Sequence, residues 1–152
     1  DGIRVLIVTG VQTCALPISL SNLDLDVEDS VDVLLEFYHN NATVPAHVHV
    51  DYLQRPPRRT CEIIGDEAYL QFDYFENELV IQAVDKQEKD VFSYSDFDRD
   101  DMFINALREF FNCIENNKGT SHDLEDGIKS LKISLAAKES INTGRVVKIN
   151  VK

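Results

Sequence analysis

Residues 51–59, with the sequence DYLQRPPRR, carry the side chains best suited to bind a polar ligand. Two consecutive prolines restrict the backbone in front of them, so Gln54 and Arg55 would be displayed in a narrow set of directions. An arginine guanidinium binds carboxylate or phosphate oxygens through paired hydrogen bonds, and a glutamine amide can donate to or accept from a hydroxyl. The pattern fits a site for an anionic, hydroxyl-bearing ligand. It fits equally an exposed loop whose arginines pair with acidic side chains.

Just before this segment, His47, His49 and Asp51 alternate along the chain and would project from one face of a strand. A His-x-His pair on a strand can hold a metal ion. The alternative is that each imidazole is hydrogen-bonded to a neighbour. We favour the alternative because the sequence offers no further ligand at a recognisable spacing, and we expect no metal site.

Apolar side chains with a two-residue period predict the strands that must position these residues. The period runs through residues 29–37 and resumes at residues 43–53, where Pro45 lacks a hydrogen-bond donor and indicates that the strand start is frayed or lies at a sheet edge. Further strands are expected at residues 61–65, 67–75, 78–84 and 86–94. Because no helix separates these runs, their pairing should be mainly antiparallel.

The period becomes helical after residue 98. Asp98 is a plausible N-cap for a helix that ends near residue 117, and its phenylalanine-rich stripe at 103–114 predicts a core contact. Thr120 with Asp123 would begin a second helix, which Gly144 would end before a last strand. The fold class is therefore α+β: an open, mainly antiparallel sheet with two helices covering one face.

Composition narrows the range of partners and compartments. The 152 residues carry a formal net charge of −12, which disfavours binding to nucleic acid or to anionic membranes without a strong basic patch. No apolar run approaches the roughly 20 residues that span a bilayer, and no secretory signal is recognisable, so we expect a cytoplasmic protein. The three cysteines lie far apart without a C-x-x-C pair, which predicts free, buried thiols.

Residues 8–18, VTGVQTCALPI, resemble the in-frame translation of a sequencing-library adapter. The preceding DGIRVLIVTG begins like a nucleotide-binding strand, but no second or third glycine follows at the required spacing. We therefore expect residues 1–18 to be a non-biological extension that carries no site, and residues 19–152 to be the domain proper. Residues 4–8 could still lie against an apolar sheet edge. The alternative is a genuine N-terminal strand.

Residues 24–149 resemble, in order and spacing, the C-terminal domain of the Gfo/Idh/MocA oxidoreductases. The resemblance rests on DLDVEDSVDVLLEF, VHVDYLQRPPRRTCEIIGDEAYLQFD, DMFINALREFFNCI and SLKISLAAKESINTGRVVKI. The DYLQRPPRRTCEIIGDEA stretch is the most specific, and it is most similar to members that act on sugars or nucleotide sugars.

The resemblance implies a protein with two parts. An N-terminal Rossmann domain would bind NAD or NADP and supply a catalytic lysine from an E-K-P motif. The C-terminal domain would wall the substrate pocket and use its sheet for homo-oligomer contacts. A histidine early in that second domain would assist the lysine in proton transfer.

This sequence lacks the cofactor-binding and catalytic motifs of that pattern. Its six glycines form no G-x-G-x-x-G, E-K-P is absent, and the expected histidine helix would precede residue 19. We therefore expect neither catalytic nor cofactor-binding residues in this chain, with NAD or NADP bound only by the parent protein.

By the same resemblance, Gln54 and Arg55 are the best candidates for substrate contact, with Tyr52 and Arg58 behind them. Their charge would suit a sugar nucleotide or a uronic acid.

The sequence thus predicts a fragment of an NAD(P)-dependent sugar oxidoreductase, inactive alone. A second hypothesis is a free-standing interaction module that assembles through its sheet. A third is a metal-dependent hydrolase that uses His47 and His49.

Overall fold

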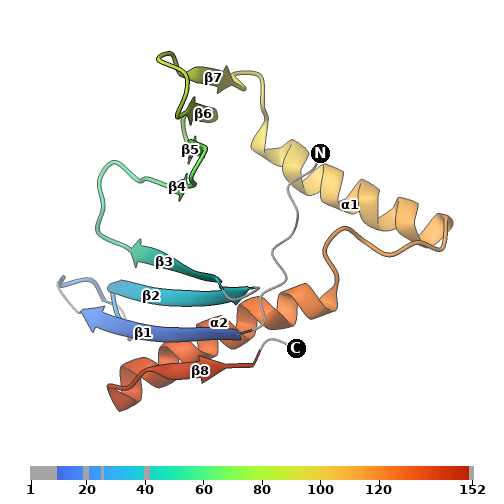
Figure 1. Cartoon of the computed structure of the whole chain (residues 1–152). Helices are drawn as coiled ribbons and strands as arrows, with labels where there is room; N and C mark the ends of the chain where they lie inside the picture. The colour runs from blue at the N-terminus through green and yellow to red at the C-terminus, as the bar shows by residue number, and fades with distance from the viewer. Residues whose placement is uncertain (1–9, 19–20, 25, 40–41, 151–152) are drawn as a thin grey trace. The chain divides into compact units, whose positions relative to one another are not determined.

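The computed structural model describes residues 10–18, 21–24, 26–39 and 42–150. The chain divides into two compact units, shown in Figure 1. Unit 1 comprises Asp1–Leu53 and Ser121–Lys152, and unit 2 comprises Gln54–Thr120. Each unit has its own four-stranded sheet and one helix.

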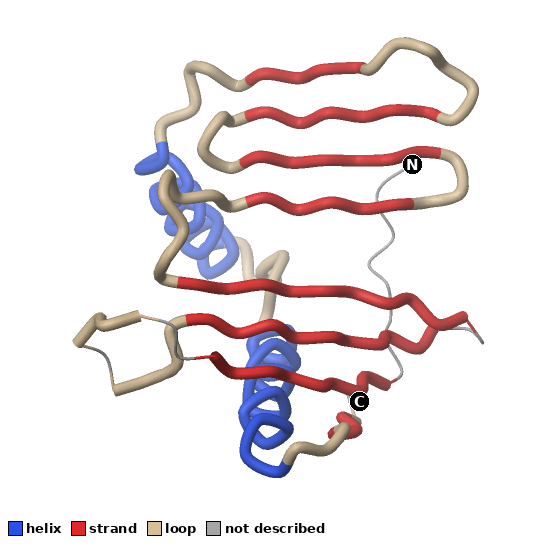
Figure 2. Tube along the Cα trace, turned by 90° about the vertical axis from the view of Figure 1, so that its left-hand side faces the viewer, coloured by secondary structure: helices blue, strands red, loops and turns tan. Residues whose placement is uncertain are grey.

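Unit 1 contains sheet A, whose strand order is β3-β2-β1-β8 and whose neighbours all pair antiparallel. Its elements are β1 (Gly10–Ile18), β2 (Ser30–His39), β3 (Ala42–Asp51), α2 (Leu124–Thr143) and β8 (Val147–Ile149). Figure 2 shows β1, β2 and β3 running side by side. β3 forms an edge of this sheet, as the proline near its start predicted.

The core of unit 1 lies between sheet A and α2, which packs against β1 and β8. Leu35 of β2, Ala136 of α2 and Ile149 of β8 form its buried cluster. Because side chains alternate along a strand, turning Leu35 towards α2 turns Asp32 and Glu36 to the opposite face of the sheet. We call that opposite face the uncovered face of sheet A.

The ends of α2 follow the local sequence. Asp123 is the N-cap, and its carboxylate accepts a hydrogen bond from the backbone N–H of Asp126. The predicted start at Thr120 is therefore wrong by three residues, because the aspartate provides the acceptor. Gly144 ends the helix in the left-handed conformation that glycine adopts without strain, at φ 63°.

Unit 2 contains sheet B, which is also antiparallel and has the strand order β4-β5-β6-β7. Its elements are β4 (Thr60–Ile64), β5 (Ala68–Asp73), β6 (Glu78–Ala83), β7 (Asp90–Ser93) and α1 (Arg99–Glu115). The register gathers apolar side chains on one face of the sheet. They are Cys61, Ile63, Leu70, Phe72, Leu79, Ile81 and Phe92.

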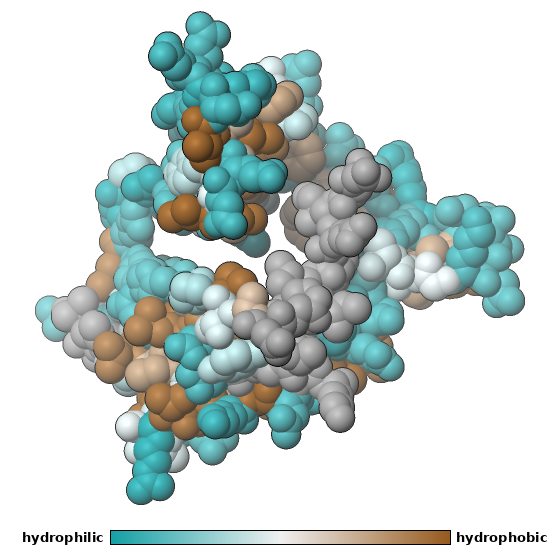
Figure 3. Space-filling view, viewed as in Figure 1, coloured by the Kyte–Doolittle hydropathy of each residue, from teal (hydrophilic) through white to brown (hydrophobic). Residues whose placement is uncertain are grey.

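The apolar stripe of α1 was predicted to be buried in the core, but it is exposed. Phe103 and Phe111 expose 64% and 59% of their surface, and Leu107 and Ile114 are similarly open. The helical period identifies which side chains share a face, but it does not specify what covers that face. Hydrophobic residues also reach the surface in the view of Figure 3.

The α+β class and the antiparallel pairing are confirmed. The strands nevertheless divide between two sheets where the sequence pattern predicted one. All three cysteines are free, as predicted, but only Cys113 is buried, while Cys14 and Cys61 are exposed. Among the described residues, no helix is both long and apolar enough to cross a membrane.

β1 is an inner strand of sheet A, although its residues fall in the segment predicted to be an extension. β1 pairs with β8 at Val11–Thr13. Beyond Thr13, the side chain of Ser140 in α2 is the hydrogen-bond partner of β1 on that side. The Ser140 hydroxyl accepts the Ala15 backbone N–H at 3.2 Å and donates to the Arg145 carbonyl at 2.7 Å. The origin of residues 1–18 stays a prediction, and residues 4–8 lie outside the described part.

The direction of the backbone N–H groups in β1 explains why the strand tolerates Pro17. The Ala15 N–H points away from β2 to Ser140, and residues two apart in a strand direct their backbone groups to the same side. An N–H group at position 17 would therefore point away from β2, to the side where β8 no longer pairs with β1. No ladder hydrogen bond with β2 is lost.

We predict that Ser140→Ala will destabilise unit 1 by about 1–3 kcal/mol, because it leaves the Ala15 N–H and the Arg145 carbonyl without their partner in a buried setting. Urea unfolding followed by circular dichroism measures the change. Ser134→Ala is the matched control, since the hydroxyl of this exposed serine donates to a carbonyl of its own helix, that of Ser130. Equal losses in the two variants would contradict the bridging role.

Thr13→Val should raise the free energy of unfolding by about 1 kcal/mol. The Thr13 side chain is 1% exposed, and its hydroxyl has no hydrogen-bond partner within the described residues. Valine keeps the branched shape and removes the unsatisfied polar atom. Thr143→Val, which deletes an exposed hydroxyl bonded to the Glu139 carbonyl, should give no such gain in the same urea experiment. A loss of stability in Thr13→Val would show that the hydroxyl has a partner.

Candidate functional site

The predicted ligand-binding segment begins where β3 ends. The Tyr52 N–H donates to the Asp29 carbonyl at 2.9 Å, while the tyrosine side chain is 57% exposed. The Asp51 carboxylate accepts the Leu53 N–H through Oδ1 at 2.6 Å. Two hydrogen bonds, donated by the backbone N–H groups of Tyr52 and Leu53, therefore fix the chain immediately before Gln54.

Unit 2 begins at Gln54, so the remaining predicted residues belong to it. Gln54, Arg55 and Arg58 are all exposed. Arg55 Nη1 donates to the Gln54 carbonyl at 2.9 Å, and the Arg55–Pro56 peptide is cis. Within the described residues, Arg58 makes no hydrogen bond or ion pair.

The Arg55 side chain thus bonds the backbone of the residue before it. The role of Gln54, Arg55 and Arg58 in ligand binding stays a prediction. The side chains available there are guanidinium and amide groups, which suit oxygen-rich, anionic ligands.

A cluster of arginine and aromatic side chains was not predicted from the sequence. The guanidinium carbons of Arg59 and Arg99 lie 4.7 and 5.0 Å from the centre of the Tyr74 ring, and Arg99 also lies 4.9 Å from that of Phe75. Such contacts stabilise by about 0.5–1 kcal/mol at exposed sites, and here they tie the start of α1 to the β5–β6 hairpin. The antiparallel register beyond Thr60–Asp73 could have placed Arg59 opposite Tyr74. No sequence signal identified Arg99.

The histidines of β3 are hydrogen-bonded on the uncovered face of sheet A, as we favoured. His47 Nε2 and His49 Nδ1 each lie 2.9 Å from Asp32 Oδ1, and His49 Nε2 lies 3.1 Å from Asp51 Oδ2. Within the described residues, no three histidine, cysteine or acidic side chains are arranged to hold a metal ion. Both imidazoles bond carboxylates of this cluster, and the metal-dependent hydrolase hypothesis stays a prediction.

Asp32 was missed as the shared partner of these histidines. The signal was the β2–β3 register, which places Asp32 directly opposite His49. Hydrogen bonds from His49 and then His47 lower the pKa of Asp32. The hydrogen bond to Asp32, and secondarily that to Asp51, raises the pKa of His49.

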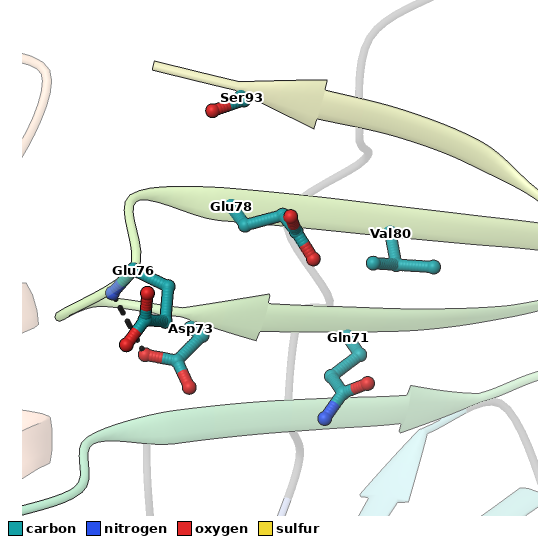
Figure 4. A pocket seen from close by; sticks show the side chains of 6 residues that line it. All are labelled: Gln71, Asp73, Glu76, Glu78, Val80 and Ser93. Atoms are coloured by element: carbon teal, nitrogen blue, oxygen red, sulfur yellow. Dashed lines mark hydrogen bonds between the residues drawn. The ribbon is translucent and has the colours of Figure 1, made fainter. Parts of the chain in front are cut away.

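Figure 4 shows a shallow polar pocket at the β5–β6 hairpin of sheet B. Three carboxylates, Asp73, Glu76 and Glu78, line it together with Gln71, Val80 and Ser93. Asp73 Oδ1 accepts the backbone N–H groups of Phe75 and Glu76, so this carboxylate stabilises the turn. A pocket lined by carboxylates repels an anionic ligand, so it does not suit the ligand class predicted for Gln54 and Arg55.

No protein-family model matches the sequence, and no curated protein matches it. Solved structures match the fold over most of the chain. Levoglucosan dehydrogenase, solved with NADH and levoglucosan, matches with a TM-score of 0.78 at 17% identity, over 95% of this chain and 46% of its own. An oxidoreductase domain protein from Kribbella flavida matches with a TM-score of 0.76 at 12% identity, over 92% and 46%.

A UDP-N-acetylglucosamine 3-dehydrogenase from Acidithiobacillus ferrooxidans matches with a TM-score of 0.70 at 19% identity, over 88% of this chain and 40% of its own. At these identities the likeness establishes the fold alone. The chain spans less than half the length of each of these three proteins.

Proposed function

We propose that residues 19–152 are the C-terminal domain of an NAD(P)-dependent oxidoreductase of the Gfo/Idh/MocA type that acts on a sugar or a nucleotide sugar. The observation that carries this proposal is the agreement between fold and sequence resemblance. Levoglucosan dehydrogenase and the UDP-N-acetylglucosamine 3-dehydrogenase match 95% and 88% of the chain. The quoted segments resemble the same kind of enzyme over residues 24–149.

In this proposal the domain contributes a wall of the substrate pocket and supplies no hydride-transfer chemistry. NAD or NADP would be held by a separate Rossmann domain, because this sequence contains no G-x-G-x-x-G cradle for a pyrophosphate. The same reasoning makes the 152-residue chain inactive alone. Neighbours of this fold solved with NADH or NAD+ support the coenzyme class.

Gln54 and Arg55 would contact the substrate, with Tyr52 and Arg58 nearby in sequence. The two hydrogen bonds at the end of β3 support this assignment, since they hold the chain in a defined path up to Leu53. An arginine there would bind a carboxylate or phosphate of the substrate. A nucleotide sugar or a uronic acid has such a group.

The uncovered face of sheet A is our candidate for self-association into a homo-oligomer. It presents the exposed apolar side chains of Leu16 and Leu34, which expose 61% and 58% of their surface. A hydrogen-bonded polar group flanks them at either end: the Asp32 cluster at one, and Glu36 with Gln12 and Tyr38 at the other. An apolar centre with a polar rim is the composition of a protein interface.

The alternative is a free-standing module that binds other proteins without catalysis. The exposed stripe of α1 favours it, because exposed apolar patches mark interaction sites. The upstream genomic reading frame separates the two. A Gly-rich strand-turn-helix within a domain's length supports the oxidoreductase, and its absence supports the module.

In an enzyme that joins this domain to its coenzyme domain, Arg55→Ala should raise the KM for an anionic sugar substrate at least about tenfold and change kcat less. The physical reason is the loss of a charge-assisted hydrogen bond to the bound substrate. Steady-state kinetics measure both constants. Arg108→Ala is the control, since this guanidinium bonds the Asn105 side chain on the surface of α1 and should leave KM unchanged. An unchanged KM in Arg55→Ala would remove Arg55 from the site.

The isolated 152-residue chain should show no saturable NADH or NADPH binding by fluorescence titration, because it lacks a backbone cradle for the pyrophosphate. Saturable binding in the micromolar range would overturn the proposed division of labour.

A further inference from the structure

His49 contacts a carboxylate through each of its two ring nitrogens. Its Nδ1 lies 2.9 Å from Asp32 Oδ1, and its Nε2 lies 3.1 Å from Asp51 Oδ2. An ionised carboxylate can only accept hydrogen bonds, so both nitrogens must donate. Only the doubly protonated imidazolium has two N–H groups, so the geometry favours the charged form of His49 while both carboxylates are ionised.

The secondary structure holds this arrangement in place. The β2–β3 register pairs Asp32 with His49, and Asp51 lies two residues further along β3 on the same face. Asp51 uses its other oxygen to accept the Leu53 N–H, which orients the carboxylate towards the imidazole. His47 Nε2 contacts the same Asp32 oxygen at 2.9 Å.

Other titratable groups on the uncovered face lie elsewhere along the strands. β2 contributes Glu36 and Tyr38, whose side chains bond each other, and Glu36 also accepts from Gln12 of β1. Cys14 of β1 and Lys148 of β8 share the face by register. Within the described residues, the charged groups bonded to His49 are Asp32 and Asp51.

We propose that His49 is a pH switch that bridges the Asp32 carboxylate of β2 and the Asp51 carboxylate at the end of β3 while it carries both ring protons, and that releases one of the two carboxylates when it loses a proton. In the deprotonated state one imidazole nitrogen has a lone pair facing a carboxylate oxygen. The resulting repulsion breaks the hydrogen bond of His49 to Asp32 or to Asp51, while the backbone ladder keeps β2 and β3 paired. The switch alters both the charge and the hydrogen bonding of the uncovered face.

The direction of the pH dependence follows from the two pKa changes. The folded-state pKa of His49 is raised, so its stabilising contribution is complete below the unfolded value of about 6.5 and is lost as pH rises through the folded value. The folded-state pKa of Asp32 is lowered, so its contribution is present above about 3.9 and is lost as pH falls through the folded value. The cluster is therefore most stabilising in mildly acidic solution.

The decisive experiment is a histidine titration of the uniformly ¹⁵N-labelled 152-residue chain by long-range ¹H–¹⁵N correlation spectra, with signals assigned through His47→Gln and His49→Gln. We expect His49 to keep both nitrogens protonated beyond pH 6.5 and to titrate above that value. Asp51→Asn should lower the midpoint of His49 and keep the side-chain shape. Asp66→Asn, which removes the same charge from the β4–β5 turn, should leave it unchanged.

A wild-type midpoint at or below about 6.5 would overturn the proposal, as would equal shifts in Asp51→Asn and Asp66→Asn. Urea unfolding at pH 6 and pH 8.5 provides a second readout. The wild type should lose stability at the higher pH, and Asp51→Asn should lose less. An equal loss in both proteins would contradict the switch.

One consequence rests on the proposed function: self-association through this face would also depend on pH. Sedimentation at pH 6 and pH 8.5 would detect it. A monomer at both values would contradict the oligomer proposal alone, because the NMR titration tests His49 in the monomer as well.

Discussion

Unit 1 depends on the two hydrogen bonds that the Ser140 hydroxyl forms. This hydroxyl lies on α2, accepts the backbone N–H of an inner strand and donates to the carbonyl at the turn into β8. The serine is 2% exposed, so water does not replace these bonds at low cost. The apolar cluster of Leu35, Ala136 and Ile149 forms beside it, with α2 held against β1 and β8. The polar bridge and the apolar core therefore support the same helix-on-sheet contact.

Local sequence signals predicted most of the helices and strands but not which of their faces are buried. Asp98 and Gly144 bound the two helices because a carboxylate cap and a left-handed glycine act within a few residues of chain. The burial of the α1 stripe failed as a prediction, because burial depends on what packs against a helix. The pairing of Asp32 with His49 also escaped prediction. It requires the register of two strands across a turn, whereas His47, His49 and Asp51 share a face through simple alternation.

In the candidate site too, local features were predicted from the sequence and contacts between distant residues were not. The prolines after Arg55 indicated a constrained segment, and the structure describes hydrogen bonds at Tyr52 and Leu53 that fix its start. Nothing local predicted that Arg99 would stack on Tyr74, since β6, β7 and their connecting loops lie between them in the sequence. β1 contains Pro17 and the buried hydroxyl of Thr13, for which the described part of the chain offers no hydrogen-bond partner. The origin of residues 1–18 stays a prediction.

The short pairing between β1 and β8 has a consequence for aggregation. An unpaired strand edge with free N–H groups can template the addition of strands from other molecules. Along the outer edge of β1 beyond Thr13, the Ala15 donor is occupied by a serine hydroxyl and Pro17 has no donor to offer. An incoming chain would find no regular ladder there, so this edge resists fibrillar growth even though its partner strand is only three residues long.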